Sequence, residues 1–92
     1  MPDNRLSFTI TLTHMSTLTL SNYTHAAAKA ILNRLYEADT QSSLQNNGLV
    51  LRGPSIMAEA KGTDDGYQIS VSSSVYEEKT LRDLVEEGLD KL

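Results

Sequence analysis

Apolar and polar residues alternate along the first part of the chain. Apolar residues stand at positions 6, 8, 10 and 12 with Ser or Thr between them, and the alternation returns over residues 17–20. A period of two is typical of a strand with one buried face. Because one strand from 6 to 20 would be unusually long, we predict a hairpin that turns near His14-Met15-Ser16. This turn lacks the usual Gly or Asn, so a single bent strand stands as the alternative.

The next segment has the composition of a helix that ends at about Ala38. Ser21, Asn22 and Thr24 are candidates for its N-cap, since their side chains can accept a hydrogen bond from the first turn. Four of residues 26–30 are alanine, which favours a helix and lets it lie close to a sheet. The residues expected on its buried face are Ala28, Ile31, Leu32 and Leu35.

A polar stretch follows this helix. Residues 39–48 are rich in loop-forming types and predict the longest loop of the chain. Residues 49–51 are apolar and predict a short strand, which Gly53-Pro54 ends. Whether this strand joins the sheet stays open at this point.

A second hairpin is predicted beyond Pro54. Segments 55–61 and 67–73 alternate with a period of two, and residues 62–66 hold the Asp and Gly residues that are typical of a turn. The residues expected to match on one face are Ile56, Ala58 and Ala60 from one arm and Tyr67, Ile69 and Val71 from the other.

The last helix has the clearest local pattern. Ser74 and Glu77 fit a capping box, in which each side chain accepts a hydrogen bond from the other residue's backbone N–H. The apolar face, spaced i, i+3, i+4, comprises Leu81, Leu84, Val85, Gly88, Leu89 and Leu92. A Gly in such a face costs about 1 kcal/mol relative to Ala, so Gly88 indicates either close packing or a frayed end.

These elements follow one another as ββα(β)ββα, which predicts the α+β class. We expect a single domain over residues 1–92, because this length suffices for one core and is too short for two. The two hairpins are expected to form one antiparallel sheet, with both helices packed on one of its faces.

Composition bears on which cellular compartment the protein occupies. The chain has no Cys, which excludes disulfides, thiolate metal sites and thiol catalysis. Small secreted domains usually depend on disulfides. The chain also shows neither a signal-peptide pattern nor an apolar run of about 18 residues. We therefore expect a cytoplasmic protein without membrane contact.

Charge argues against direct nucleic-acid binding. Twelve Asp and Glu residues against eight Lys and Arg residues give a net charge of −4, and the basic residues are scattered. Proteins that bind phosphates usually carry a basic stripe. An acidic excess suits a protein partner with a basic surface, and it equally suits plain solubility.

No residue pattern predicts catalysis. His14 and His25 have no second ligand at metal spacing, and Asp64-Asp65-Gly66 holds too few oxygen ligands for a calcium loop. The serines at 70 and 72–74 lack a nucleophile motif, and the glycines form no nucleotide-binding motif. The threonines at positions 9, 11, 13, 17 and 19 are typical of the solvent side of a strand. The sequence thus predicts no catalytic residue, no metal ligand and no cofactor.

The acidic side of the last helix is the candidate partner-binding site. Acidic residues in this position suit a basic groove on a partner, and the alternative is a solvated helix face. The candidate residues are Glu78, Asp83, Glu86, Glu87 and Asp90.

We therefore hypothesise a small, acidic, non-enzymatic protein-binding module. In size and charge it is comparable to inhibitors, antitoxins, immunity proteins and phage anti-defence proteins. The second hypothesis is a self-assembling structural or accessory subunit, a homodimer or larger, with Met57, Tyr36 and Tyr76 at the interface. The third is a small ligand-binding protein or enzyme that uses His25, Arg34 or Tyr36.

Overall fold

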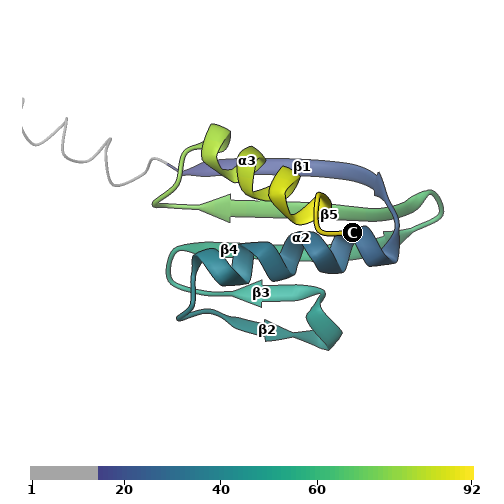
Figure 1. The fold of residues 1–92 in the computed structure, drawn as a ribbon, viewed down its shortest axis with the longest axis horizontal. Helices are drawn as coiled ribbons and strands as arrows, with labels where there is room; N and C mark the ends of the chain where they lie inside the picture. Colours follow the sequence, from purple (N-terminus) through teal and green to yellow (C-terminus); the bar gives the residue numbers. More distant parts are fainter. Residues whose placement is uncertain (1–14) are drawn as a thin grey trace, which may run out of the picture.

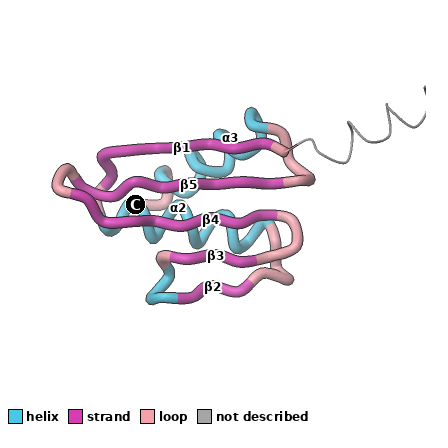
Figure 2. The backbone as a smooth tube through the Cα atoms, turned by 180° about the vertical axis from the view of Figure 1, so that it is seen from behind, coloured by secondary structure: helices cyan, strands magenta, loops and turns pink. Residues whose placement is uncertain are grey.

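The computed structural model describes residues 15–92, which form a sheet and two helices in two layers (Figure 1). In chain order the elements are β1 (Ser16–Tyr23), α2 (His25–Ala38), β2 (Ser43–Gln45), the short 3-10 helix η1 (Asn46–Gly48), β3 (Val50–Arg52), β4 (Ile56–Thr63), β5 (Gly66–Ser73) and α3 (Glu78–Leu89). Within this part of the chain, the sheet has five antiparallel strands in the order β1-β5-β4-β3-β2. Both helices lie on the same face of it (Figures 1 and 2). The predicted α+β class, with both helices on one face of an antiparallel sheet, is confirmed.

The order of elements differs from the predicted ββα(β)ββα. One described strand precedes α2 and four follow it. The strand predicted over 6–13 lies outside the described residues, as does His14 of its turn. Ser16, which was predicted to lie in that turn, instead opens β1 and pairs with Ser73 of β5.

The start of α2 is set by Thr24. Its Oγ1 accepts a hydrogen bond from the backbone N–H of Ala27 at 3.1 Å, so Thr24 is the N-cap. Ser21 and Asn22 are not caps, because β1 continues to Tyr23. The register of β1 against β5 shifts between Leu20 and Tyr23, and Asn22 adopts a left-handed φ of 69°. Asn tolerates this conformation better than most residues, and the irregularity bends the end of the strand.

The predicted loop over 39–48 contains two elements. β2 pairs with β3, and Leu44 packs against the rim of the core. η1 then reverses the chain between them, with φ values of 51° at Asn46, 59° at Asn47 and 85° at Gly48. Asn and Gly are the residues that adopt positive φ most readily. The strand predicted at 49–51 is β3, one residue later, and it joins the sheet between β2 and β4.

The second hairpin is confirmed and is longer than predicted. Ala58 lies opposite Val71 and Ala60 opposite Ile69, with their side chains on the helix-covered face. β4 continues to Thr63 and β5 begins at Gly66, so only Asp64-Asp65 remains as the connection. In the corner, the Thr63 hydroxyl donates a hydrogen bond to the Gly66 carbonyl oxygen at 2.8 Å.

The predicted capping box of α3 is wrong. The N-cap is Glu77, which makes no side-chain capping bond, and Ser74 is exposed. Ser73 instead organises this turn, because its Oγ accepts hydrogen bonds from the N–H groups of Val75 and Tyr76 at 3.0 and 2.8 Å. It also donates to the carbonyl oxygen of Ser55 at 2.7 Å, which explains how a side chain only 2% exposed keeps its hydroxyl satisfied.

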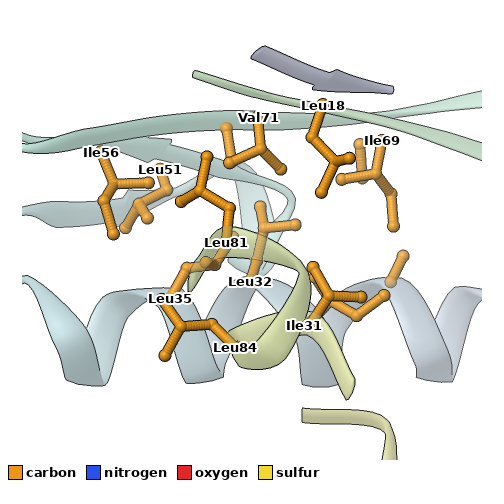
Figure 3. Close-up of a cluster of buried hydrophobic side chains, with 14 residues drawn as sticks. Leu18, Ile31, Leu32, Leu35, Leu51, Ile56, Ile69, Val71, Leu81 and Leu84 are labelled. Carbon is orange, nitrogen blue, oxygen red and sulfur yellow. The ribbon is translucent and has the colours of Figure 1, made fainter. Parts of the chain in front are cut away.

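One core lies between the sheet and the helices (Figure 3). The predicted faces of both helices are buried in it, except that Leu89 is only half-buried and Leu92 lies beyond the end of α3 and is exposed. Gly88 marks the contact between α2 and α3. A Cβ at this position would lie 2.9 Å from the Ala30 carbonyl oxygen and 3.1 Å from the Ile31 Cα. Of the two alternatives left open for Gly88, close packing is therefore the one that is confirmed.

Candidate functional site

α2 and α3 leave one face of the sheet uncovered in the described part of the chain (Figure 2). Its side chains alternate with the core residues along every strand, as the pleat requires. We call this surface the open face. Its members on β1, β5, β4 and β3 that line up across the strands are Thr17, Thr19, Ser70, Ser72, Met57, Glu59, Val50 and Arg52.

Strand register arranges the open face into rows. Thr17 of β1 lies opposite Ser72 of β5, which lies opposite Met57 of β4, which lies opposite Arg52 of β3. The next row is formed in the same way by Thr19, Ser70, Glu59 and Val50. Each row therefore runs from hydroxyl groups on β1 and β5 to apolar and charged side chains on β4 and β3.

A groove of about 320 Å³ crosses the open face over β1, β5, β4 and β3. On the side of β1 and β5, the outward side chains that line it are Ser and Thr. Met57 is 46% exposed on β4, an inner strand of the sheet, with Val50 in the next row. Arg52 and Glu59 also line the groove, so its lining contains one positive and one negative side chain. The groove thus combines hydrogen-bonding groups, an apolar centre and balanced charge.

The serines that the sequence placed close together are separated by the fold. Ser70 and Ser72 project from the open face, Ser73 is buried in the capping role described above, and Ser74 is exposed. His25, the histidine within the described residues, begins α2 and packs against Tyr67 with ring centroids 5.3 Å apart, and it forms no hydrogen bond with Ser70 or Ser72. In the described residues, therefore, no serine has the neighbours of a catalytic nucleophile.

The candidate metal ligands are also dispersed. Asp64 and Asp65 occupy the exposed β4–β5 turn, and His25 begins α2. Among residues 15–92, no three His, Asp or Glu side chains come close enough to hold a metal ion.

The acidic residues of α3 are largely engaged within the chain. Glu78 pairs with Arg82 at 2.9 Å, Asp83 with Lys79 at 3.7 Å, and Glu87 with Arg34 of α2 at 2.8 Å. The last pair links the two helices. The two acidic residues of the predicted set without an ion pair to another described residue are Glu86 and Asp90, both exposed.

The three apolar residues predicted for an interface have different surroundings. Met57 belongs to the open face, and Tyr36 is exposed on α2. Tyr76 packs against the rim of the core, and its hydroxyl donates to the Ala38 carbonyl oxygen at 3.4 Å. Tyr76 is therefore a structural residue in this fold.

Sequence reasoning missed the groove because its walls come from segments far apart in the chain. Alternation alone correctly indicated that Thr17, Thr19, Ser70, Ser72 and Met57 point away from the core. The order of the strands, which brings these residues together, has no local signal.

Fold and surface together define a two-layer α+β protein with one sheet face left open. No family model matches the chain, and neither does any curated protein or solved structure. Neither helix of the described part is long and apolar enough to cross a bilayer.

Proposed function

We propose that this protein is a small acidic protein-binding module that acts by contact and without catalysis, and that the open face receives its partner. The observation that carries the proposal is the groove across four strands on the face that no helix covers. Ligand pockets are usually about 300–1,000 Å³ and enclose most of their ligand. A groove at the lower end of this range, open along a sheet, suits a segment of another protein better than an enclosed metabolite.

The composition of the groove supports this proposal. Met and Arg are enriched in protein interfaces, and Met57 and Arg52 lie opposite each other in one row. Met adapts its shape to different partners because its side chain is unbranched and flexible. The small hydroxyl side chains on β1 and β5 allow a partner to approach the sheet closely. A partner segment with one apolar side chain for Met57 and polar groups for the serines and threonines fits this surface.

The test compares two exposed apolar residues. Met57→Glu places a charge in the groove, whereas Val75→Glu places the same charge on a residue that is 63% exposed outside it. We expect the wild-type protein and Val75→Glu to capture the same partner from an extract of the native host, and Met57→Glu to lose it. Circular dichroism checks that both variants fold. Equal capture by the two variants would contradict the proposal.

The acidic side of α3 is the second candidate surface, and it fits a partner with a basic groove, as an inhibitor, antitoxin or immunity protein requires. Glu86 and Asp90 favour it, because their charges are exposed and unpaired within the described residues. Glu87 should stay unchanged in a test, since its pair with Arg34 joins the helices.

The matched comparison for this surface is two double reversals of charge. Glu86→Lys with Asp90→Lys changes α3, and Asp64→Lys with Asp65→Lys makes the same change in net charge at the β4–β5 turn. If α3 is the contact surface, only the first variant loses the partner, and high salt releases the partner from the wild type. Capture that resists both the α3 reversal and salt would rule this surface out.

A further inference from the structure

One edge of the described sheet is much longer than the other. β1 spans eight residues and pairs with β5 on one side, and no described residue pairs with its other side. β2, at the opposite edge, spans three residues. An edge strand presents N–H and C=O groups that can pair with another strand. β1 can therefore form more backbone hydrogen bonds with an added strand than β2 can.

Beside this edge, the layer of helices leaves apolar surface partly uncovered. Leu20 and Tyr23 of β1 and Leu89 of α3 are half-buried, and they line a hollow of about 90 Å³ between β1 and α3. Arg82 and Glu86 stand on the same flank of α3, one helical turn apart, and line the same hollow. This flank points away from α2, which contacts α3 at Gly88.

We propose that a second copy of this chain pairs antiparallel with β1 about a twofold axis at Thr19. Residues opposite each other in an antiparallel pair point to the same face. In this register Leu18 lies opposite Leu20 of the second copy, and Leu20 opposite Leu18, all on the helix face. Thr19 lies opposite Thr19 of the second copy on the open face. Both faces are thus self-complementary, and the two sheets become continuous.

The charged residues on the outer flank of α3 are also complementary to themselves across a twofold axis at Thr19. Leu18 and Leu20 flank Thr19 along β1, and Arg82 and Glu86 line the hollow beside those two leucines. Arg82 pairs with Glu78 of its own chain at 2.9 Å. A twofold axis there also brings Arg82 opposite Glu86 of the second copy and Glu86 opposite Arg82, two attractive pairs from one flank. Leu89 and Tyr23 become covered in the same step. This complementarity of charge and of apolar surface is what favours a second copy over an unrelated strand.

The mass of the full chain in solution, measured without any partner, tests for this dimer. The result therefore does not depend on whether the open face binds a partner. Sedimentation equilibrium of the wild-type protein is expected to show a reversible dimer. Arg82→Glu places only acidic residues on both flanks, and Glu86→Arg places only basic ones. Each variant alone is expected to dissociate about tenfold more readily, since two attractive pairs become repulsive. An equimolar mixture of the two variants restores both pairs and is expected to recover the wild-type affinity.

The strand contact has its own matched variants. Thr19→Asp brings two carboxylates together on the axis, whereas Gln45→Asp adds the same charge at the opposite edge of the open face. Only Thr19→Asp is expected to weaken the dimer. A single-chain mass at all concentrations overturns the proposal. A dimer that is indifferent to the charge variants, or a mixture no tighter than its components, also overturns it.

Discussion

Asp39 is a buried carboxylate at the corner where α2 ends and β4 begins. Its Oδ2 accepts hydrogen bonds from the backbone N–H groups of Ser55 and Ile56 at 3.0 and 3.2 Å. A buried backbone donor without an acceptor costs about 1–3 kcal/mol. The side chain of Asp39 thus holds the β3–β4 connection against the end of α2.

We expect Asp39→Ala to lower the free energy of unfolding by about 2–4 kcal/mol, since two donors lose their acceptor. Asp39→Asn keeps a carbonyl oxygen at the site and should cost less. Urea unfolding measures both, with Asp64→Ala at the exposed turn as a control that is expected to change stability by less than about 0.5 kcal/mol. Equal losses for Ala and Asn would show that the hydrogen bonds are not what matters at this corner.

Residue roles were predictable only where the backbone position was certain. Thr24 was one of three candidate caps, and the end of β1 decides among them. The serine that caps the turn before α3 is Ser73, although Ser74 fits the sequence pattern. Both residues have the right chemistry, but only Ser73 points inward at the end of β5, where free N–H groups converge. The pairing of β5 with its neighbouring strands fixes which of its side chains point inward. It therefore decides which of the two serines can cap the turn.

At the scale of elements, the contact between α2 and α3 depends on the missing side chain of Gly88. An added methyl group would meet backbone atoms of Ala30 and Ile31, which cannot rotate away. Overpacking of this kind costs about 1–3 kcal/mol, and the gain in helix propensity from Gly to Ala returns about 1 kcal/mol.

Gly88→Ala is therefore expected to lower the free energy of unfolding by up to about 2 kcal/mol. The matched control is Lys79→Ala, at an exposed position of the same helix, which should stay within about 0.5 kcal/mol of the wild type. Thermal unfolding followed by circular dichroism measures both. Stabilisation by Gly88→Ala would mean that helix propensity outweighs the close approach of the helices.

The elements with strong periodicity were predictable, and β2 was not. α2, α3 and the two strands of the β4–β5 hairpin each have eight or more residues and a repeated apolar face. β2 has three residues, of which only Leu44 turns inward. Its strand conformation comes from pairing with β3, and that pairing depends on the Asn-Asn-Gly turn between them. Local composition alone therefore favours a loop.

On the scale of the whole molecule, the position of a charge matters more than its count. The acidic residues of α3 were predicted as one surface, yet three of the five are paired within the chain. The open face, which has little net charge, was not predicted as a site, because strand order assembles it. Counting charge along the sequence therefore overstates how acidic the surface of α3 is and hides the groove.

The proposed dimer has a consequence for the stability of the whole molecule. A chain of this size has a small core, and coverage of Leu20, Tyr23 and Leu89 by a second copy would add to it. Where unfolding is coupled to dissociation, stability depends on protein concentration. We expect the wild-type melting temperature to rise by several degrees over a hundredfold increase in concentration. Arg82→Glu should melt at a temperature that depends less on concentration, and mixing it with Glu86→Arg should restore the dependence. A melting temperature that is constant with concentration for all three samples would mean that the core of one chain is stable without the second copy.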